Sequence, residues 1–233
     1  MKKTGVLMAI LLSILLFSCA RESKGATLLH WAAQEGYVDV LSDLLEKPSL
    51  AVNQLNEKNE TALLLALKNE KPKTAALLLD KGAALDFIDS RGWNYLHWAA
   101  FTGAADLAKG FSENPALANG VNKDKNTALH LALERGHREI SLSLLKLETL
   151  SNVNQQNNKG DTALHLACFK GYDDVVKLIL AKKPELNLKN KRGYYAIQLA
   201  AEANHKSIVE MLIQAGADTS VIWPARDFLD LIF

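Results

Sequence analysis

The sequence predicts an all-α protein built from about six consecutive helix–turn–helix units joined by β-hairpin-like loops. Three observations predict this fold. A short apolar motif returns at nearly constant spacing, a glycine follows most copies of it, and a second apolar helical pattern follows each copy. Self-similarity at a period of about 20–50 residues is typical of repeat architectures, in which each unit buries its apolar side only against its neighbours.

The N-terminal segment, residues 1–18, has the order of a secretory signal peptide. Lys2 and Lys3 precede an apolar run over residues 6–17, and small residues follow. A helix needs about 20 apolar residues to cross a bilayer, so this run is too short to span one. We therefore expect the segment to be removed after export.

The end of that segment, Leu16-Phe17-Ser18-Cys19, resembles the lipobox of bacterial lipoproteins. In that family the cysteine is lipidated and becomes the mature N-terminus. The resemblance implies a lipid on Cys19 and a short tether over residues 19–26, and the several acyl chains of such an anchor hold a protein firmly at a membrane. The alternative is ordinary signal-peptide cleavage near Ala20, which leaves no lipid.

The apolar motif has six copies, of which Ala128-Leu129-His130-Leu131-Ala132-Leu133 is typical. The residues that open the copies are separated by 34, 33, 33, 35 and 33 residues, and they are Thr27, Thr61, Asn94, Thr127, Thr162 and Tyr195. This motif and period resemble the ankyrin repeat family. The resemblance covers residues 27–218 and implies a right-handed solenoid that binds other proteins.

Each unit is predicted to contain two helices. A glycine ends the first helix in four units, where left-handed backbone is needed: Gly36, Gly103, Gly136 and Gly171. Glu70 and Asn204 take that place in the second and sixth units, and Pro72 follows Glu70, so we expect the second unit to be the most irregular. The turns between units are assigned to Arg91-Gly92, Lys159-Gly160 and Arg192-Gly193.

The last residues, 219–233, are predicted to cap the apolar end of the sixth unit. Pro224 suits the first turn of a helix, and an apolar run closes the chain at Phe233. The alternative is a docking peptide for a partner, since exposed apolar residues invite association.

Composition and charge exclude several classes of function. The formal net charge is +1, and it becomes −1 when Lys2 and Lys3 are removed. A nucleic-acid partner is not expected, because phosphate-driven affinity requires several clustered lysines or arginines. The two cysteines lie in unrelated contexts, so no disulfide framework is predicted, and Cys168 is interpreted as a small buried filler.

No catalytic residue, metal site or cofactor is predicted. All six histidines fall on repeat positions, four after the opening leucine and two, His137 and His205, just past the residue that ends the first helix. The ankyrin resemblance implies that the first four bridge the backbones of adjacent units. The chain has no zinc-binding histidine pair, no glycine-rich phosphate loop and no glycine-flanked nucleophilic serine.

A partner-binding site is predicted on the hairpin tips and on the exposed side of the first helices, which line the concave face in ankyrin arrays. Aromatic residues occupy tip and helix positions that the repeat leaves free of packing, and two basic residues lie beside them. The candidate site consists of Trp93, Phe101, Arg135, Phe169, Lys170 and Tyr194. Exposed aromatics commonly anchor partners, although these rings could instead pack on neighbouring hairpins. Trp31 and Trp98 replace a leucine of other units, so we expect them to be structural.

The hairpin tips are mildly basic, which indicates either a solvated rim or an acidic partner surface. The tip cations are Arg91, Lys123, Lys125, Lys159, Lys191 and Arg192.

The sequence therefore predicts a monomeric, non-catalytic module that binds another protein. We expect it to be exported and tethered to the bacterial cell envelope, with membrane contact only through the lipid. Two alternatives stay open: a secreted, lipid-free effector that binds host proteins, and an enzyme whose site lies in the departures from the repeat.

Overall fold

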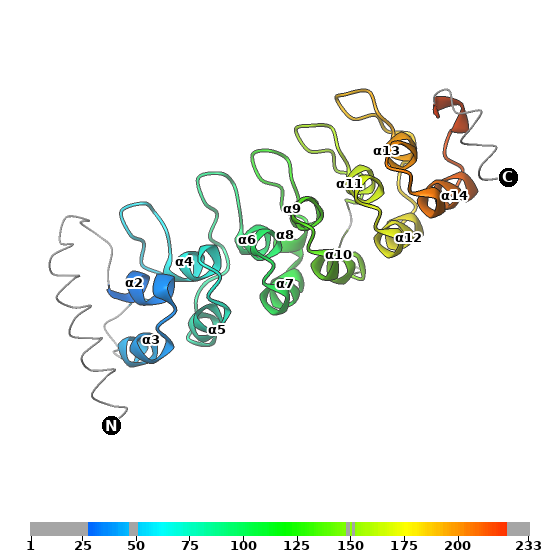
Figure 1. The fold of residues 1–233 in the computed structure, drawn as a ribbon. Helices are drawn as coiled ribbons and strands as arrows, with labels where there is room; N and C mark the ends of the chain where they lie inside the picture. The colour runs from blue at the N-terminus through cyan, green and yellow to red at the C-terminus, as the bar shows by residue number, and fades with distance from the viewer. Residues whose placement is uncertain (1–27, 47–50, 148–149, 151, 223–233) are drawn as a thin grey trace. The chain divides into compact units, whose positions relative to one another are not determined.

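A computed structural model describes residues 28–46, 51–147, 150 and 152–222 (Figure 1). These residues form thirteen α-helices and one 3-10 turn, and their only extended pairing is an antiparallel bridge between Lys189 and Tyr195. The predicted all-α class is confirmed. Cys19, the segment around it and the opening Thr27 lie outside the described residues, as does most of the predicted C-terminal cap.

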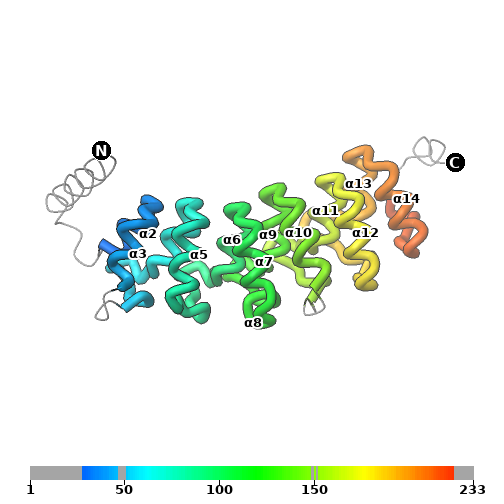
Figure 2. Tube along the Cα trace, turned by 90° about the horizontal axis from the view of Figure 1, so that it is seen from below, coloured from blue at the N-terminus to red at the C-terminus, as the bar shows by residue number. Residues whose placement is uncertain are grey.

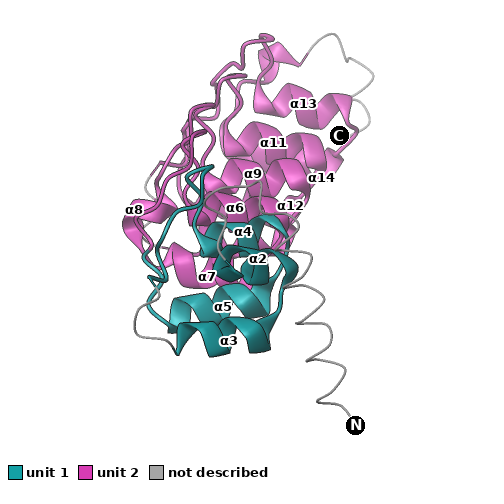
Figure 3. Cartoon of the chain, turned by 90° about the vertical axis from the view of Figure 1, so that its left-hand side faces the viewer, with its two compact units in different colours: residues 1–84 teal, residues 85–233 magenta. Residues whose placement is uncertain are grey.

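The chain divides into two compact units between Ala84 and Leu85, and each is described by itself (Figure 3). Unit 1 contains two helix pairs. They are α2 (Leu28–Glu35) with α3 (Val38–Leu45), and α4 (Ala62–Lys68) with α5 (Pro72–Asp80). The first helices α2 and α4 pack together, and so do the second helices α3 and α5.

Unit 2 contains four such helix pairs, which follow one another in chain order (Figure 2). The first helices, which pack on one another in sequence, are α6 (Tyr95–Thr102), α9 (Ala128–Arg135), α11 (Ala163–Lys170) and α13 (Ala196–Glu202). The second helices form the other layer and are α7 (Ala105–Ser112), α10 (Arg138–Leu145), α12 (Asp173–Ala181) and α14 (Lys206–Gln214). The loops that precede α9, α11 and α13 project beyond the first-helix layer (Figure 1).

Four of the opening residues act as helix caps. The side chains of Thr61, Thr127 and Thr162 each accept a hydrogen bond from the backbone N–H three residues later, and Asn94 does the same. Such a bond satisfies one of the N–H groups that the first turn of a helix leaves without a partner. The first helices therefore start at a fixed residue although the proline usual in ankyrin repeats is absent.

The predicted left-handed residues lie where the first helices end. Gly103, Gly136 and Gly171 have φ of 81°, 84° and 73°. Glu70 and Asn204 also adopt positive φ, of 55° and 59°, so the backbone imposes this conformation even where glycine is replaced.

The prediction that the second repeat, which opens at Thr61, is the most irregular is wrong. Both of its helices form, because Pro72 occupies the first turn of α5, where the missing N–H has no intrahelical partner in any case. The third repeat, which opens at Asn94, instead contains an additional element, the short helix α8 (Pro115–Ala118), which Asn114 caps.

The core of each unit lies between its two helical layers. Alanines of the repeated motif are fully buried where helices approach closely, as at Ala66, Ala132 and Ala167, and larger side chains such as Ile179 fill the space between the layers. Cys168 is also fully buried, which confirms its interpretation as a core filler, and burial raises the pKa of its thiol. Deeply buried thiols are poor nucleophiles.

The first residues of the predicted cap, up to Ile222, are described. They form the 3-10 turn η1 (Thr219–Val221), and the carbonyl of Val221 accepts a hydrogen bond from Gln198 Nε2 at 2.6 Å. This contact lies on the last first-helix, α13. The remainder of the predicted cap, from Trp223 to Phe233, lies outside the described residues.

Candidate partner-binding surface

One asparagine or aspartate braces each hairpin from within. In the hairpin before α11, Asn157 Oδ1 accepts hydrogen bonds from the backbone N–H groups of Lys159 and Asp161 at 2.9 and 3.0 Å. The same pair of bonds recurs five residues before each of the last five opening residues, at Asn56, Asp89, Asn122, Asn157 and Asn190. These residues were not among those predicted from the sequence, although their constant spacing from the opening residue is a signal of this turn.

Consecutive hairpins of unit 2 are joined by backbone hydrogen bonds. Lys123 N–H donates to Arg91 O at 3.0 Å, Asn158 N–H to Asp124 O at 2.8 Å, and Lys191 N–H to Lys159 O at 2.9 Å. These bonds involve only main-chain atoms, so the tip side chains are left for other contacts.

Side chains add a second link between two of these hairpin pairs. Asn157 Nδ2 donates to Asn126 Oδ1 at 3.0 Å, and Asn190 Nδ2 donates to Asp161 Oδ1 at 2.8 Å. In both cases the acceptor belongs to the residue just before an opening residue. The residue before the opening residue therefore has a structural role in these repeats, whereas the sequence predicted that its side chain would make no contacts within the fold.

The four motif histidines bridge adjacent units, as predicted. In unit 2, His130 Nε2 lies 3.0 Å from Asp161 O, His165 Nε2 lies 3.2 Å from Tyr194 O, and His97 Nε2 lies 3.0 Å from Asn126 O. In unit 1, His30 Nε2 lies 3.1 Å from Glu60 O. Burial lowers the pKa of each imidazole, to about 4 for His97. A neutral imidazole that donates from Nε2 satisfies these carbonyls, so these histidines are structural.

The other two histidines each contact the end of the first helix of the preceding repeat. His137 Nε2 lies 3.2 Å from Phe101 O, and His205 Nε2 lies 3.3 Å from Phe169 O. Each ring lies against the glycine that ends that helix, since a Cβ added to Gly103 would come within 2.6 Å of the His137 ring. The backbones of Phe101 and Phe169 are therefore fixed by a histidine of the following repeat.

The prediction that Trp93 is exposed is wrong, because only 5% of its surface is accessible. Its ring lies 4.8 Å from that of Trp98 and 5.0 Å from that of Phe101. Trp98 and Phe101 are three residues apart on α6 and so share a helix face, against which the hairpin folds Trp93. Trp98 is buried, in agreement with its predicted structural role.

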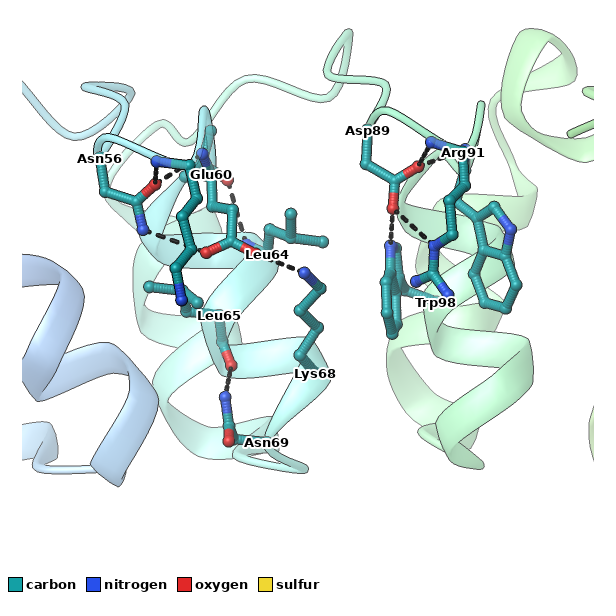
Figure 4. Close-up of polar contacts among 12 residues, drawn as sticks. Asn56, Glu60, Leu64, Leu65, Lys68, Asn69, Asp89, Arg91 and Trp98 are labelled. Carbon is teal, nitrogen blue, oxygen red and sulfur yellow. Dashed lines mark hydrogen bonds and ion pairs between the residues drawn. The ribbon is translucent and has the colours of Figure 1, made fainter. Parts of the chain in front are cut away.

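Two guanidinium groups stack on this aromatic cluster. Arg91 Cζ lies 4.4 Å from the Trp93 ring centroid and 4.6 Å from that of Trp98, and Arg135 Cζ lies 3.7 Å from that of Phe101. Asp89 holds Arg91 in place, with Oδ2 at 3.6 Å from Arg91 Nε and at 3.3 Å from Trp98 Nε1 (Figure 4). The structure thus brings together three of the predicted site residues, Trp93, Phe101 and Arg135.

The other three candidates lie apart from this cluster. Phe169 is 58% exposed and Lys170 is exposed, both at the end of α11. Tyr194 is half-buried beneath Arg192, whose Cζ lies 5.1 Å from its ring centroid. The predicted exposure therefore holds for Phe169, fails for Trp93, and holds in part for Phe101 and Tyr194.

In unit 1 the position that corresponds to Trp93 carries an ion pair instead of an aromatic ring. Glu60 pairs with Lys68 and accepts from Asn56 Nδ2 at 3.1 Å (Figure 4). Burial raises the pKa of Glu60, but its bonds to Lys68 and Asn56 outweigh that effect and the net pKa is lowered. The equivalent surface of unit 1 is therefore internally neutralised.

We define the tip face of unit 2 as its four hairpin tips, residues 89–93, 122–126, 157–161 and 190–194, with the exposed side chains of α6, α9 and α11. Lys159 is paired with Glu134 at 3.0 Å, whereas Arg135, Lys170 and Lys191 have no carboxylate partner among the described residues. The exposed charge on the tip face is predominantly positive.

The described residues contain no group of three histidine, cysteine, aspartate or glutamate side chains that could hold a metal ion. None of the described helices has the length and hydropathy that a membrane span requires. The chemistry of the tip face is that of hydrogen-bond donors, cations and aromatic rings.

A family model described as Ankyrin repeats (3 copies) matches residues 29–119, 112–190 and 144–222. The chain belongs to the ankyrin repeat family. Ankyrin repeats form a scaffold that binds other proteins, and membership of the family implies this general role.

Relatives and solved structures agree with this assignment. The putative ankyrin repeat protein YahD of Escherichia coli is 28% identical over 191 residues, which are 80% of this chain and 94% of YahD. The chain spans only 15–17% of the length of larger relatives that it matches. An ankyrin repeat domain from Acinetobacter baumannii has a TM-score of 0.71 at 28% identity, over 82% of this chain and 98% of that domain.

A further similar structure comes from a complex of two proteins. This complex contains the predatory endopeptidase Bd0816 of Bdellovibrio bacteriovorus and the immunity protein Bd3460. The matched chain has a TM-score of 0.67 at 25% identity, over 82% of this ankyrin repeat protein and 99% of that chain.

Proposed function

We propose that this ankyrin repeat protein is tethered to the bacterial cell envelope and holds another protein through the tip face of unit 2. One observation carries the choice of face. Phe169 is an exposed phenylalanine beside Lys170, which has no carboxylate partner among the described residues, and His205 of the next repeat fixes its backbone. A rigid, exposed aromatic side chain with cationic neighbours is typical of an anchor in protein recognition.

The binding role follows from the family, whereas the tether is supported by the sequence around Cys19. Mass spectrometry of the mature N-terminus is the experiment that tests the tether. We expect a Cys19 N-terminus that carries acyl chains, and loss of membrane fractionation in Cys19→Ala. An unmodified N-terminus at Ala20 would contradict the tether and would favour the secreted effector.

The face is tested by replacing the two candidate phenylalanines. We expect Phe101→Ala with Phe169→Ala to reduce crosslinked partner at least about tenfold, because truncation of an aromatic anchor commonly costs more than about 1 kcal/mol of binding. The measurement is quantitative mass spectrometry of proteins crosslinked to the wild type and to the variant in the native cell envelope.

Tyr37→Ala is the matched control, because Tyr37 is an aromatic residue of unit 1 that is 47% exposed. It should leave the crosslinked partner unchanged. If the control reduces crosslinking as strongly as the double variant, or if the double variant captures the partner as well as wild type does, the tip face of unit 2 is not the binding surface.

A further inference from the structure

The junction between the hairpins that precede α6 and α9 contains two buried donors that lack an acceptor. At the next two junctions, the bracing asparagine donates from Nδ2 to Asn126 or Asp161. At this junction the corresponding position is Trp93, whose side chain offers no acceptor. Asn122 Nδ2 and Trp93 Nε1 are both buried without a hydrogen-bond partner, in residues that are 4% and 5% exposed. Orphaned buried donors are costly, so each one requires an explanation.

The two stacked guanidinium groups belong to the aromatic cluster beside this junction. Arg91 covers Trp93, and Arg135 covers Phe101, which is itself in contact with Trp93. Stacking occupies the face of a guanidinium and leaves its N–H edge available for a planar acceptor. Among the described residues Arg135 forms no ion pair, and Arg91 is joined to Asp89 only at 3.6 Å.

Two of the acidic residues near this junction, Asp89 and Glu134, already have partners. Asp89 Oδ1 already accepts from the backbone N–H groups of Arg91 and Trp93 at 2.8 and 2.9 Å, and its Oδ2 accepts from Trp98. Glu134 is paired with Lys159. The junction therefore presents donors and cations in excess of acceptors.

We infer that Arg91, Trp93, Asn122 and Arg135, the donor cluster, recognise carboxylates of an acidic segment of the partner protein. The inference rests on the proposed function, since it names the chemistry of the partner that the tip face holds. Arginine edges match a carboxylate with two parallel hydrogen bonds. The exposed arginines make the first contact, and Trp93 Nε1 and Asn122 Nδ2 are the donors that the junction itself leaves without an acceptor.

A protein segment fits better than a phosphate polymer. The chain is close to neutral, and unit 1 neutralises its equivalent position with the Glu60–Lys68 pair. Nucleic-acid binding depends on many phosphate contacts, whereas this cluster holds two arginines beside apolar rings. Aromatic surface flanked by arginines is instead the composition enriched in protein interfaces.

The test uses a fluorescent peptide in which glutamate alternates with leucine, and its glutamine counterpart, with fluorescence anisotropy at low ionic strength. We expect the glutamate peptide to bind and the glutamine peptide to bind at least about tenfold more weakly. Arg91→Gln and Arg135→Gln should each weaken binding roughly fivefold or more, and Arg135→Lys nearly as much, because lysine keeps the charge but loses the planar fork.

Arg138→Gln is the matched control, since it removes the same charge from the same repeat unit but lies on α10, paired with Asp174 at 2.9 Å. It should leave peptide affinity within about twofold of wild type. The inference is overturned if the glutamate peptide does not bind, if Arg138→Gln weakens binding as much as Arg135→Gln, or if Arg135→Lys binds like wild type. Tighter binding of an oligonucleotide or of phosphatidylglycerol vesicles than of the peptide overturns it as well.

Failure of this inference can be told apart from failure of the proposed function. If the phenylalanine variants lose the crosslinked partner while the arginine variants still bind the glutamate peptide normally, the binding face stands and only the assignment of carboxylate recognition to the donor cluster is wrong. Circular dichroism of each arginine variant verifies that the helices are intact.

Discussion

Gly160→Ala is expected to destabilise the protein by about 3 kcal/mol. Gly160 has φ of 77°, and a Cβ added there would come within 2.6 Å of Lys191 N and 3.0 Å of two backbone atoms of Asn190. These neighbours are backbone of the next hairpin, which cannot move without breaking the bond from Lys191 N–H to Lys159 O. Urea unfolding followed by circular dichroism measures the loss.

Gly193→Ala is the matched control for that prediction. Gly193 occupies the same place in the following hairpin with φ of 85°, but a Cβ there would meet nothing within 4 Å. It should cost only the strain of left-handed backbone, about 1 kcal/mol. Equal losses in the two variants would show that the hairpin contact contributes nothing to stability.

Acid is expected to destabilise the protein through its buried histidines. The folded-state pKa of His97 is lowered to about 4 from 6.5 by burial, and those of His30, His130 and His165 are lowered too. As the pH falls below 6.5, the unfolded chain binds protons that the folded chain does not, so stability is complete above pH 6.5 and is lost toward pH 4. His97 alone should account for about 3 kcal/mol of that loss.

The measurement is the urea midpoint between pH 7.5 and 4, compared with His97→Gln. Glutamine is the natural residue at this position in the sixth unit, where Gln198 accepts from Tyr195 N–H at 2.9 Å and donates to Val221 O. The variant keeps both kinds of contact without a titrating group. It should therefore lose less stability on acidification than wild type, and an unchanged slope would contradict the assignment to His97.

The helical scaffold was predictable from sequence because each unit repeats the same local chemistry. The glycines at left-handed positions and the bridging histidines are each specified by a few neighbouring residues. Glu70 and Asn204 replace this glycine in the second and sixth repeats, and both still adopt positive φ. The packing of the two helices of a repeat therefore imposes the left-handed conformation even without glycine.

The candidate site was predictable only in part, because burial at a hairpin tip depends on which side chains face it. Trp93 and Phe169 both stand at variable repeat positions, yet Trp93 is buried since Trp98 and Phe101 form a platform for its ring. The lone Nδ2 of Asn122 follows from that same substitution of tryptophan for an acceptor. Which side chains meet at a hairpin tip is decided by tertiary packing, which repeat spacing alone does not specify.

The way the hairpins of unit 2 are fastened has a consequence for engineering. The main chain and one internal Asx side chain set their geometry, so residues such as Lys123 and Lys191 could be randomised together in a display library without disturbing the helices. A binder selected in this way would acquire a new target on an unaltered frame.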